Sequence, residues 1–156
     1  MNENENDKVK MVFAKATANN FCAIVAYKDG SMLKVCEVVE SENITDFISA
    51  VSELAKKHRP ELVHYECTVY LSECAVLRSE LINENIRVRG YNSFGSYIDR
   101  IVSQAEWISN NVLVEEKYAD FIDRMTSFSV SDTEKDNIAI DVLSDAAWFF
   151  RRYYFK

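Results

Sequence analysis

The chain has 156 residues, 48% of them hydrophobic and 12% aromatic. This length and composition are sufficient for one sizeable hydrophobic core, and the hydrophobic content is too high for a disordered protein. A formal net charge of −7 at pH 7 excludes attraction to nucleic acid over the whole surface, but it leaves open a local basic face or a carboxylate cation site. No apolar run approaches the roughly 18 to 20 residues that span a bilayer, and MNENENDKVK lacks a signal-peptide core, so we expect a soluble cytoplasmic protein.

Residues 1–9 are polar and charged, so we expect a disordered lead-in followed by one domain over residues 10–156. The first part of that domain, residues 11–40, contains apolar runs broken at ANN and at KDG. Asp29-Gly30 between two such runs is a hairpin signal, and the segment predicts an antiparallel meander. An amphipathic helix follows and ends at Pro60.

The rest of the chain alternates strands and helices. We expect a strand in 61–70, a helix in 71–85, a strand in 86–91, a helix in 96–111, a short strand in 112–116, a short helix in 117–128 and a closing helix in 132–155. A strand-helix-strand crossover of this length implies parallel pairing. The fold class is therefore α/β, a mixed sheet with helices against its faces.

Two acids stand out from the surface carboxylates. Glu66 lies near the carboxyl end of a predicted strand, where crossover units commonly bind ligands. Asp141 lies in an apolar stretch of the closing helix, where a divalent cation shared with Glu66 would compensate its burial. For Asp145, one turn later, we expect an ordinary solvated helix surface, as for the capping acids at positions 132 and 134.

Several collinear stretches resemble one protein family. Asp136-Asn137-x-x-x-Asp141 followed by VLSDAAWFF is similar to the closing acidic motif in the nuclease domain of viral and phage terminase large subunits. FCAIVAYKDGSMLKVCEVV resembles the first hairpin of that domain, VHYECTVY its second acidic strand, and SYIDRIVSQAEWISNNVLVEE its helix-strand segment. The resemblance covers roughly residues 11–150.

This family is a branch of the ribonuclease-H-like nucleases. The resemblance implies a mixed sheet of five strands or slightly more, flanked by helices, with acids that hold two Mg²⁺ or Mn²⁺ ions for phosphodiester hydrolysis. Carried over by position, Glu66 and Asp141 would be catalytic metal ligands, and Asp136 would help at the second ion.

The first acidic position departs from the family. VFAKATANN places Lys15 where the family has an aspartate that touches both metals. An ammonium in place of a carboxylate changes the local charge by two units, which disfavours divalent ions. Lys15 can instead occupy a cation position and pair with Glu66 and Asp141.

Three arginines are candidates for DNA contact. Arg87 and Arg89 alternate in IRVRGY, and Arg100 matches the helix arginine of the family. Ordinary surface roles account for them equally well, and a salt bridge to Asp99 or Glu106 would account for Arg100. In the aromatic tail we expect Trp148 and Phe149 to pack in the core.

The sequence thus supports two functional hypotheses and a weaker third. The first is a metal-dependent endonuclease domain of a DNA-packaging terminase, cutting double-stranded viral DNA in the cytoplasm of an infected cell and inactivated if Lys15 excludes the metals. The second is a catalytically silent module of this fold that binds DNA or a packaging partner. The third is a junction resolvase. The sequence contains no phosphate-binding G-x-x-x-x-G-K-[ST], so an ATPase motor would have to be a separate or removed partner.

Overall fold

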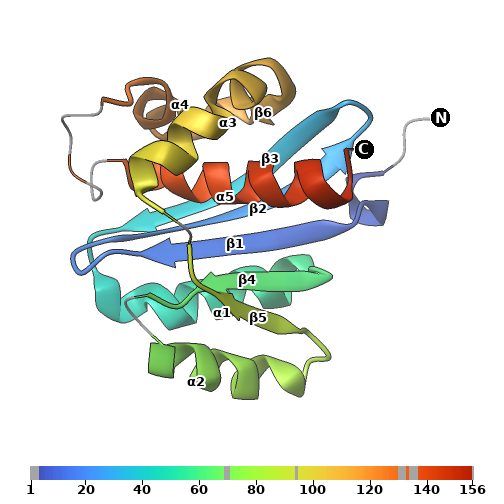
Figure 1. Cartoon of the computed structure of the whole chain (residues 1–156). Coiled ribbons are helices and arrows are strands. Elements are labelled where there is room, and N and C mark those ends of the chain that lie inside the picture. The colour runs from blue at the N-terminus through green and yellow to red at the C-terminus, as the bar shows by residue number, and fades with distance from the viewer. Residues whose placement is uncertain (1–3, 69–70, 94, 130–132, 134–136, 156) are drawn as a thin grey trace.

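The computed structural model describes residues 4–68, 71–93, 95–129, 133 and 137–155, and a six-stranded sheet forms the centre of this part of the chain (Figure 1). Its strands are β1 (Lys10–Ala16), β2 (Phe21–Asp29), β3 (Met32–Ser41), β4 (Leu62–Glu66), β5 (Val88–Tyr91) and β6 (Val112–Val114). They lie in the order β5-β4-β1-β2-β3-β6. The helices are α1 (Phe47–His58), α2 (Leu71–Ile82), α3 (Tyr97–Asn111), α4 (Ala119–Thr126) and α5 (Ile138–Tyr153).

The first three strands form an antiparallel meander. β1 pairs with β2, and β2 pairs with β3, as alternating runs of apolar residues with short polar connections require. Gly30 adopts a φ of 59° in the connection between β2 and β3, a conformation that glycine adopts without steric cost. All residues of β1 are buried, because helices cover both faces of the sheet at this strand.

The other three strands pair in parallel, since a helix separates each from the preceding strand. β4 lies beside β1 in a register that pairs Phe13 with His64 and Ala14 with Tyr65. β5 lies beside β4 and ends at Tyr91 opposite Glu66. β6 extends the opposite edge beside β3.

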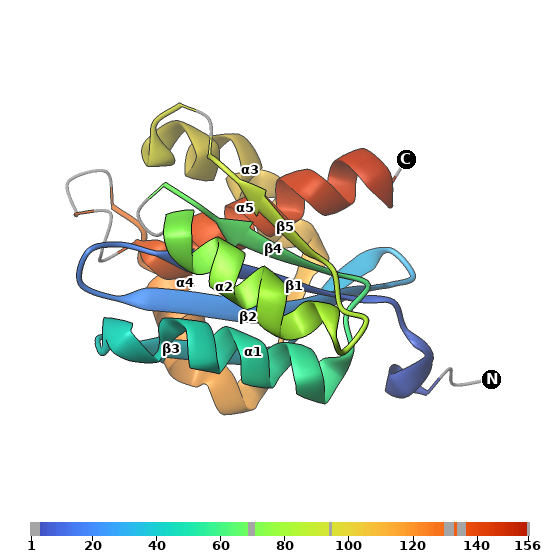
Figure 2. The same ribbon diagram turned by 90° about the horizontal axis from the view of Figure 1, so that it is seen from below.

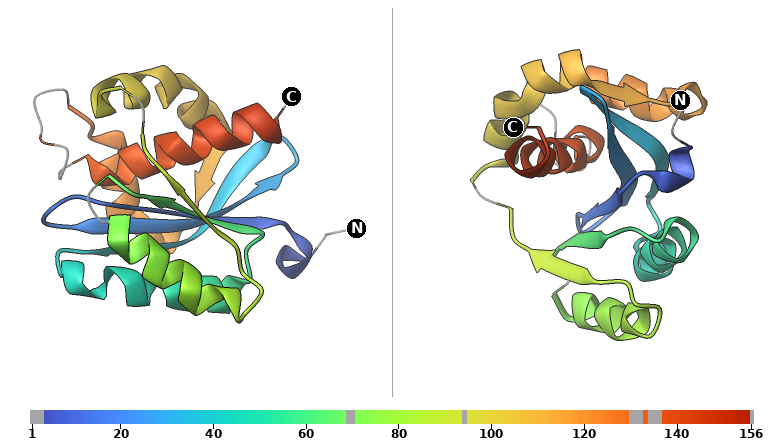
Figure 3. Two further views of the ribbon diagram at one scale, coloured as in Figure 1. Left: turned by 60° about the horizontal axis from the view of Figure 1, so that its bottom comes forward. Right: turned by 90° about the vertical axis from the view of Figure 1, so that its right-hand side faces the viewer.

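The helices form one layer on each side of the sheet (Figures 1 and 2). α1 and α2 cover one face, with a core that includes Val12, Val63 and Tyr65. α3, α4 and α5 cover the other face (Figure 3), and the core on this side includes Phe13, Ile24 and Val142. The second layer faces the side chains of Lys15 and Glu66, because these residues lie two positions beyond Phe13 and His64 along their strands.

The predicted order of elements and the mixed α/β sheet are confirmed, and the short strand predicted in 112–116 is β6 at the sheet edge. The four cysteines are buried free thiols. α5 begins at Ile138, later than predicted, and Asp136 and the acids at 132 and 134 lie outside the described residues. In the expected lead-in, Glu5–Asp7 form one 3-10 turn. Within the described chain, no helix combines the length and apolarity needed to cross a membrane.

Candidate functional site

Lys15 lies at the centre of a buried ion-pair cluster. It comes from β1, is only 1% exposed, and its Nζ lies 3.1 Å from Asp141 Oδ2 and 2.8 Å from Asp145 Oδ2. The two aspartates come from α5, where a spacing of four residues places them on one side of the helix. A buried lysine requires such partners, since an isolated buried charge is strongly unfavourable.

Arg100 adds a second cation from α3. Its Nε lies 3.2 Å from Asp141 Oδ1 and its Nη2 3.0 Å from Asp141 Oδ2, so the guanidinium binds the carboxylate with two nitrogens. Its Nη1 donates to the Gly95 carbonyl oxygen over 2.9 Å, and its Nε lies 3.7 Å from Asp145 Oδ1. Lys15, Arg100, Asp141 and Asp145, called the ion-pair cluster below, therefore carry balanced charges.

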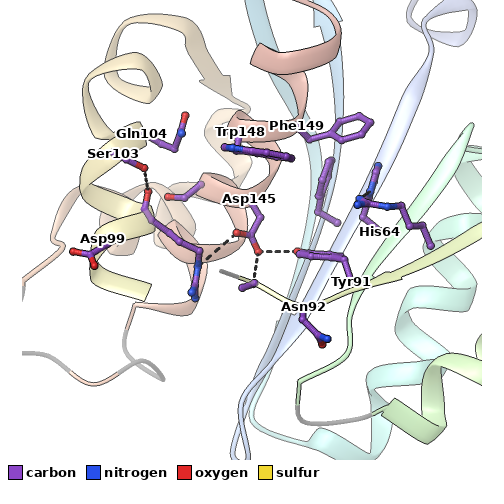
Figure 4. Close-up of a pocket in the computed structure, with 14 residues that line it drawn as sticks. His64, Tyr91, Asn92, Asp99, Ser103, Gln104, Asp145, Trp148 and Phe149 are labelled. Carbon is purple, nitrogen blue, oxygen red and sulfur yellow. Dashed lines mark hydrogen bonds and ion pairs between the residues drawn. The ribbon is translucent and has the colours of Figure 1, made fainter. Parts of the chain in front are cut away.

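Asp145 is also bound from β5 and the segment after it. The Tyr91 hydroxyl donates to Asp145 Oδ2 over 2.7 Å and the Ser93 hydroxyl over 3.2 Å (Figure 4). Burial, followed by the negative charge of Asp145, raises the pKa of Tyr91 well above its usual value, so the phenol stays protonated as a donor. The expectation of a solvated Asp145 is wrong, because this side of α5 faces Lys15 and not water.

Glu66 ends β4 as predicted, but its carboxylate does not join the ion-pair cluster. It is 6% exposed and accepts hydrogen bonds from the Thr68 backbone N–H, at 2.7 Å, and from the Thr68 hydroxyl. Among the described residues, Glu66 forms no ion pair with Lys15, so of the two partners expected for Lys15 the structure shows Asp141 alone. Asp145 takes the other place.

The described carboxylates do not fit a two-metal centre as they stand. Asp141 is fully buried, and both of its oxygens already accept from cationic donors of Lys15 or Arg100. No group of three or more histidine, cysteine or acidic side chains in the described ranges is arranged to hold an ion. Mg²⁺ and Mn²⁺ prefer oxygen ligands, and here a lysine and an arginine neutralise the oxygens that would supply them.

The three arginines proposed for DNA contact are not equivalent. Arg100 faces the ion-pair cluster, where its guanidinium binds Asp141. Arg89 is exposed, lies over the Tyr91 ring at 5.8 Å, and contacts His64 Nδ1 through its Nη1 at 3.4 Å. Arg87 is an exposed residue immediately before β5.

A cavity of about 340 Å³ lies next to the ion-pair cluster and is bounded by Arg100, Asp145 and several aromatic residues (Figure 4). Trp148 lines it and is 48% exposed, so the prediction that Trp148 packs in the core is wrong. Phe149 is half-buried, and its ring packs against the His64 ring with the two centroids 4.3 Å apart. His64 was not among the predicted site residues, although it lies two positions before Glu66 and therefore on the same face of β4.

The sheet order and its two helical layers are those of the ribonuclease-H-like fold, and solved structures with this fold match the chain. No protein-family model and no curated protein matches it. The fowlpox virus Holliday junction resolvase is 15% identical, with 92% of this chain and 99% of that chain covered and a TM-score of 0.62. The human cytomegalovirus terminase nuclease domain, Mn soaked, is 9% identical, with 96% of this chain and 86% of that chain covered and a TM-score of 0.65.

The nuclease domain of the bacteriophage SPP1 large terminase, with bound Mn, is 11% identical, with 92% of this chain and 86% of that chain covered and a TM-score of 0.63. The resemblance to terminase nuclease domains is thus found in three dimensions over most of the chain. At these identities the similarity establishes the fold.

Proposed function

We propose that this chain is a ribonuclease-H-like module in which Lys15 takes the place of the divalent cations, so that the module binds DNA without hydrolysing it. The observation that carries the proposal is the position of Lys15 Nζ, 3.1 Å from Asp141 and 2.8 Å from Asp145. The ammonium supplies the positive charge that the buried Asp141 and the partly buried Asp145 require.

The lysine and a divalent ion would compete for the same oxygens. Asp141 Oδ2 accepts from both Lys15 and Arg100, and Asp141 Oδ1 accepts from Arg100. Metal binding would require both donors to move and would place an ammonium next to the ion, with the repulsion poorly screened in a buried site. This arrangement favours a silent site over a catalytic one.

DNA binding is supported by the neighbours of the fold and by the surface near β5. Fowlpox virus resolvase has also been solved in complex with its substrate Holliday junction DNA. Arg87 and Arg89 are both exposed at β5 on the present chain, where guanidinium groups can bind phosphates. We therefore expect binding to duplex or branched DNA through a local basic surface.

A second candidate is a metal-dependent endonuclease domain of a DNA-packaging terminase, with Glu66, Asp141 and Asp136 as ligands of Mg²⁺ or Mn²⁺. One observation favours it: the charges of Glu66 and Asp141 both raise the pKa of Tyr91, after the larger effects of burial and Asp145. Both acids therefore lie near one phenol, as members of a single site should. This candidate adds viral packaging proteins and a separate ATPase motor as partners.

Cleavage assays on variants of Lys15 distinguish the two candidates. We expect the natural chain to shift supercoiled plasmid and a four-way junction in gels, but to cut neither in Mn²⁺ or Mg²⁺. Metal-dependent cutting by the natural chain that disappears in Asp141→Asn would refute the silent module in favour of the nuclease. No binding to any DNA would refute both candidates.

Lys15→Asp tests whether the remaining acids can serve as a metal site. We expect this variant to gain Mn²⁺-dependent cutting, and the double variants with Asp141→Asn or Glu66→Gln to lose it again. Circular dichroism of each variant controls for folding. A folded Lys15→Asp variant that stays inert would overturn the assignment of Glu66 and Asp141 as metal ligands.

A further inference from the structure

The cavity beside the ion-pair cluster has aromatic walls that no part of the proposed DNA contact uses. Phe13 and Phe149 line it together with the half-exposed Trp148. Its volume of about 340 Å³ lies at the lower end of the range for small-ligand pockets, roughly 300 to 1,000 Å³. A flat ring would fit these walls better than a flexible polar chain, since aromatic faces favour stacking.

The cavity wall also contains a buried hydrogen-bond donor without an acceptor. His64 lines the cavity, is 1% exposed, and stacks on Phe13 with centroids 4.3 Å apart. Its Nδ1 faces the guanidinium of Arg89, which can only donate, and this contact assigns the ring proton to Nε2. Nε2 finds no hydrogen-bond partner in the described part of the chain and is covered by its neighbours, so an acceptor in the cavity reaches it only after a side chain of the wall shifts.

A buried donor of this kind is unfavourable unless a ligand brings an acceptor. The edge of a nucleobase carries carbonyl oxygens or ring nitrogens that accept hydrogen bonds, and its faces stack on aromatic side chains. The rest of the wall suits a nucleotide: Arg89 is an exposed cation, and Asn92 carries an amide that can pair with a base edge. Asp99 also lines the cavity, so we place the phosphate on the Arg89 side.

We propose that this cavity takes one unpaired nucleobase of a DNA strand, stacked on Trp148 and hydrogen-bonded by His64 Nε2–H, with Arg89 at the adjoining phosphate. The proposal rests on the DNA binding proposed above and specifies which DNA the module prefers. Single strands and branch points supply such bases at little cost, whereas a base in a duplex must first be unstacked.

The emission of Trp148 provides a direct test. The chain has two tryptophans, so Trp107→Phe leaves Trp148 as the sole one, and Trp107 does not line the cavity. We expect a short oligothymidylate to quench this emission and to bind roughly tenfold more tightly than an abasic strand of the same length, as one stacked base implies. Equal affinity for the two strands, or saturation without quenching, would overturn the proposal.

Two substitutions check which side chains hold the base. Trp148→Ala should remove the preference for the base-bearing strand and keep the weaker affinity shared with the abasic strand. His64→Phe keeps a ring on Phe13 but removes the donor, so it should reduce the preference several-fold without lowering stability. If His64 were only a packing residue, His64→Phe would leave the preference unchanged.

A duplex without unpaired bases separates this proposal from the proposed function. Duplex binding with no preference for base-bearing over abasic strands refutes the cavity proposal and leaves DNA binding standing. Quenching and a base preference, combined with DNA cutting by the natural chain, refute the silent module and leave the cavity proposal standing. Failure to bind any strand refutes both.

Discussion

At the scale of single residues, Lys15 shows how one ammonium can compensate two acids of the same helix. Its Nζ lies within 3.1 Å of Asp141 and 2.8 Å of Asp145. Asp141 is fully buried and would be unfavourable without Lys15 and Arg100. The lysine is therefore a structural requirement of this chain.

Removing the ammonium should destabilise the fold strongly. Lys15→Met keeps most of the side-chain volume but leaves Arg100 as the only described cation beside the buried Asp141 and the partly buried Asp145, so we expect a loss of about 3–5 kcal/mol in the free energy of unfolding. Urea denaturation measures this loss. Lys57→Met is the matched control, because Lys57 forms a 3.0 Å pair with Glu37 while its side chain is 65% exposed, and such pairs contribute about 0–1 kcal/mol. A loss as small as that of the control would contradict this account.

His64 predicts how stability depends on pH. Its pKa is about 3 in the fold against an ordinary value of 6.5, so below pH 6.5 the unfolded chain binds a proton that the folded chain does not. Stability is therefore lost as the pH falls from 6.5 toward 3. Between pH 7 and 5 the natural chain should lose about 2 kcal/mol more than His64→Phe, as urea denaturation at each pH would show. His58 is present in both proteins, so its contribution cancels, and parallel pH curves would contradict the prediction.

At the scale of elements, one side of α5 packs in the core and another carries the acids of the ion-pair cluster. Its apolar side chains, including Val142 and Ala146, pack on β1 and β2, and the acids at 141 and 145 face Lys15. On the other side of the sheet, α2 approaches β5 closely enough that the chain has a glycine at the contact. A Cβ at Gly90 would lie 2.7 Å from Cys67 Sγ and 3.0 Å from Cys74 Sγ.

Gly90→Ala should therefore separate α2 from β5. We expect a loss of about 1–3 kcal/mol, the usual cost of an overpacked core. The same substitution in a Cys67→Ala background should cost less, because the smaller side chain removes the nearest atom. A double-mutant cycle by urea denaturation measures the coupling, and additive losses would show that the close approach is not the cause.

At the scale of the whole molecule, sequence patterns predict the fold better than the site. Alternation and helical spacing predicted the order of strands and helices, because each element buries its own apolar face. Glu66 at a strand end and the burial of Asp141 were accessible from local context. The role of Asp145 and the exposure of Trp148 were not, since both depend on how α5 is rotated against β1 and β5. The roles proposed for Glu66, Asp141 and Asp136 stay predictions.

Metal binding should be visible in the stability of the entire chain. An ion that binds the folded state raises the free energy of unfolding by about 2.7 kcal/mol at a hundred times its Kd. We expect Mn²⁺ to change the Tm of the natural chain by no more than about a degree. It should raise the Tm of Lys15→Asp by several degrees, because each kcal/mol of stabilisation raises the Tm of a chain of this size by about 2–4 °C. Differential scanning fluorimetry with Ca²⁺ and with EDTA as controls measures both shifts. A comparable Mn²⁺ shift in the natural chain would contradict the exclusion of metal by Lys15.

The ion-pair cluster also has a consequence for folding kinetics. Lys15 and Asp141 are 126 positions apart along the chain, and Arg100 and Tyr91 reach the same aspartates from two further elements. Contacts that require four distant elements to be in place are expected to form late. Lys15→Met should therefore accelerate unfolding much more than it slows folding. The lysine in the acidic site would thus determine how long each molecule stays folded.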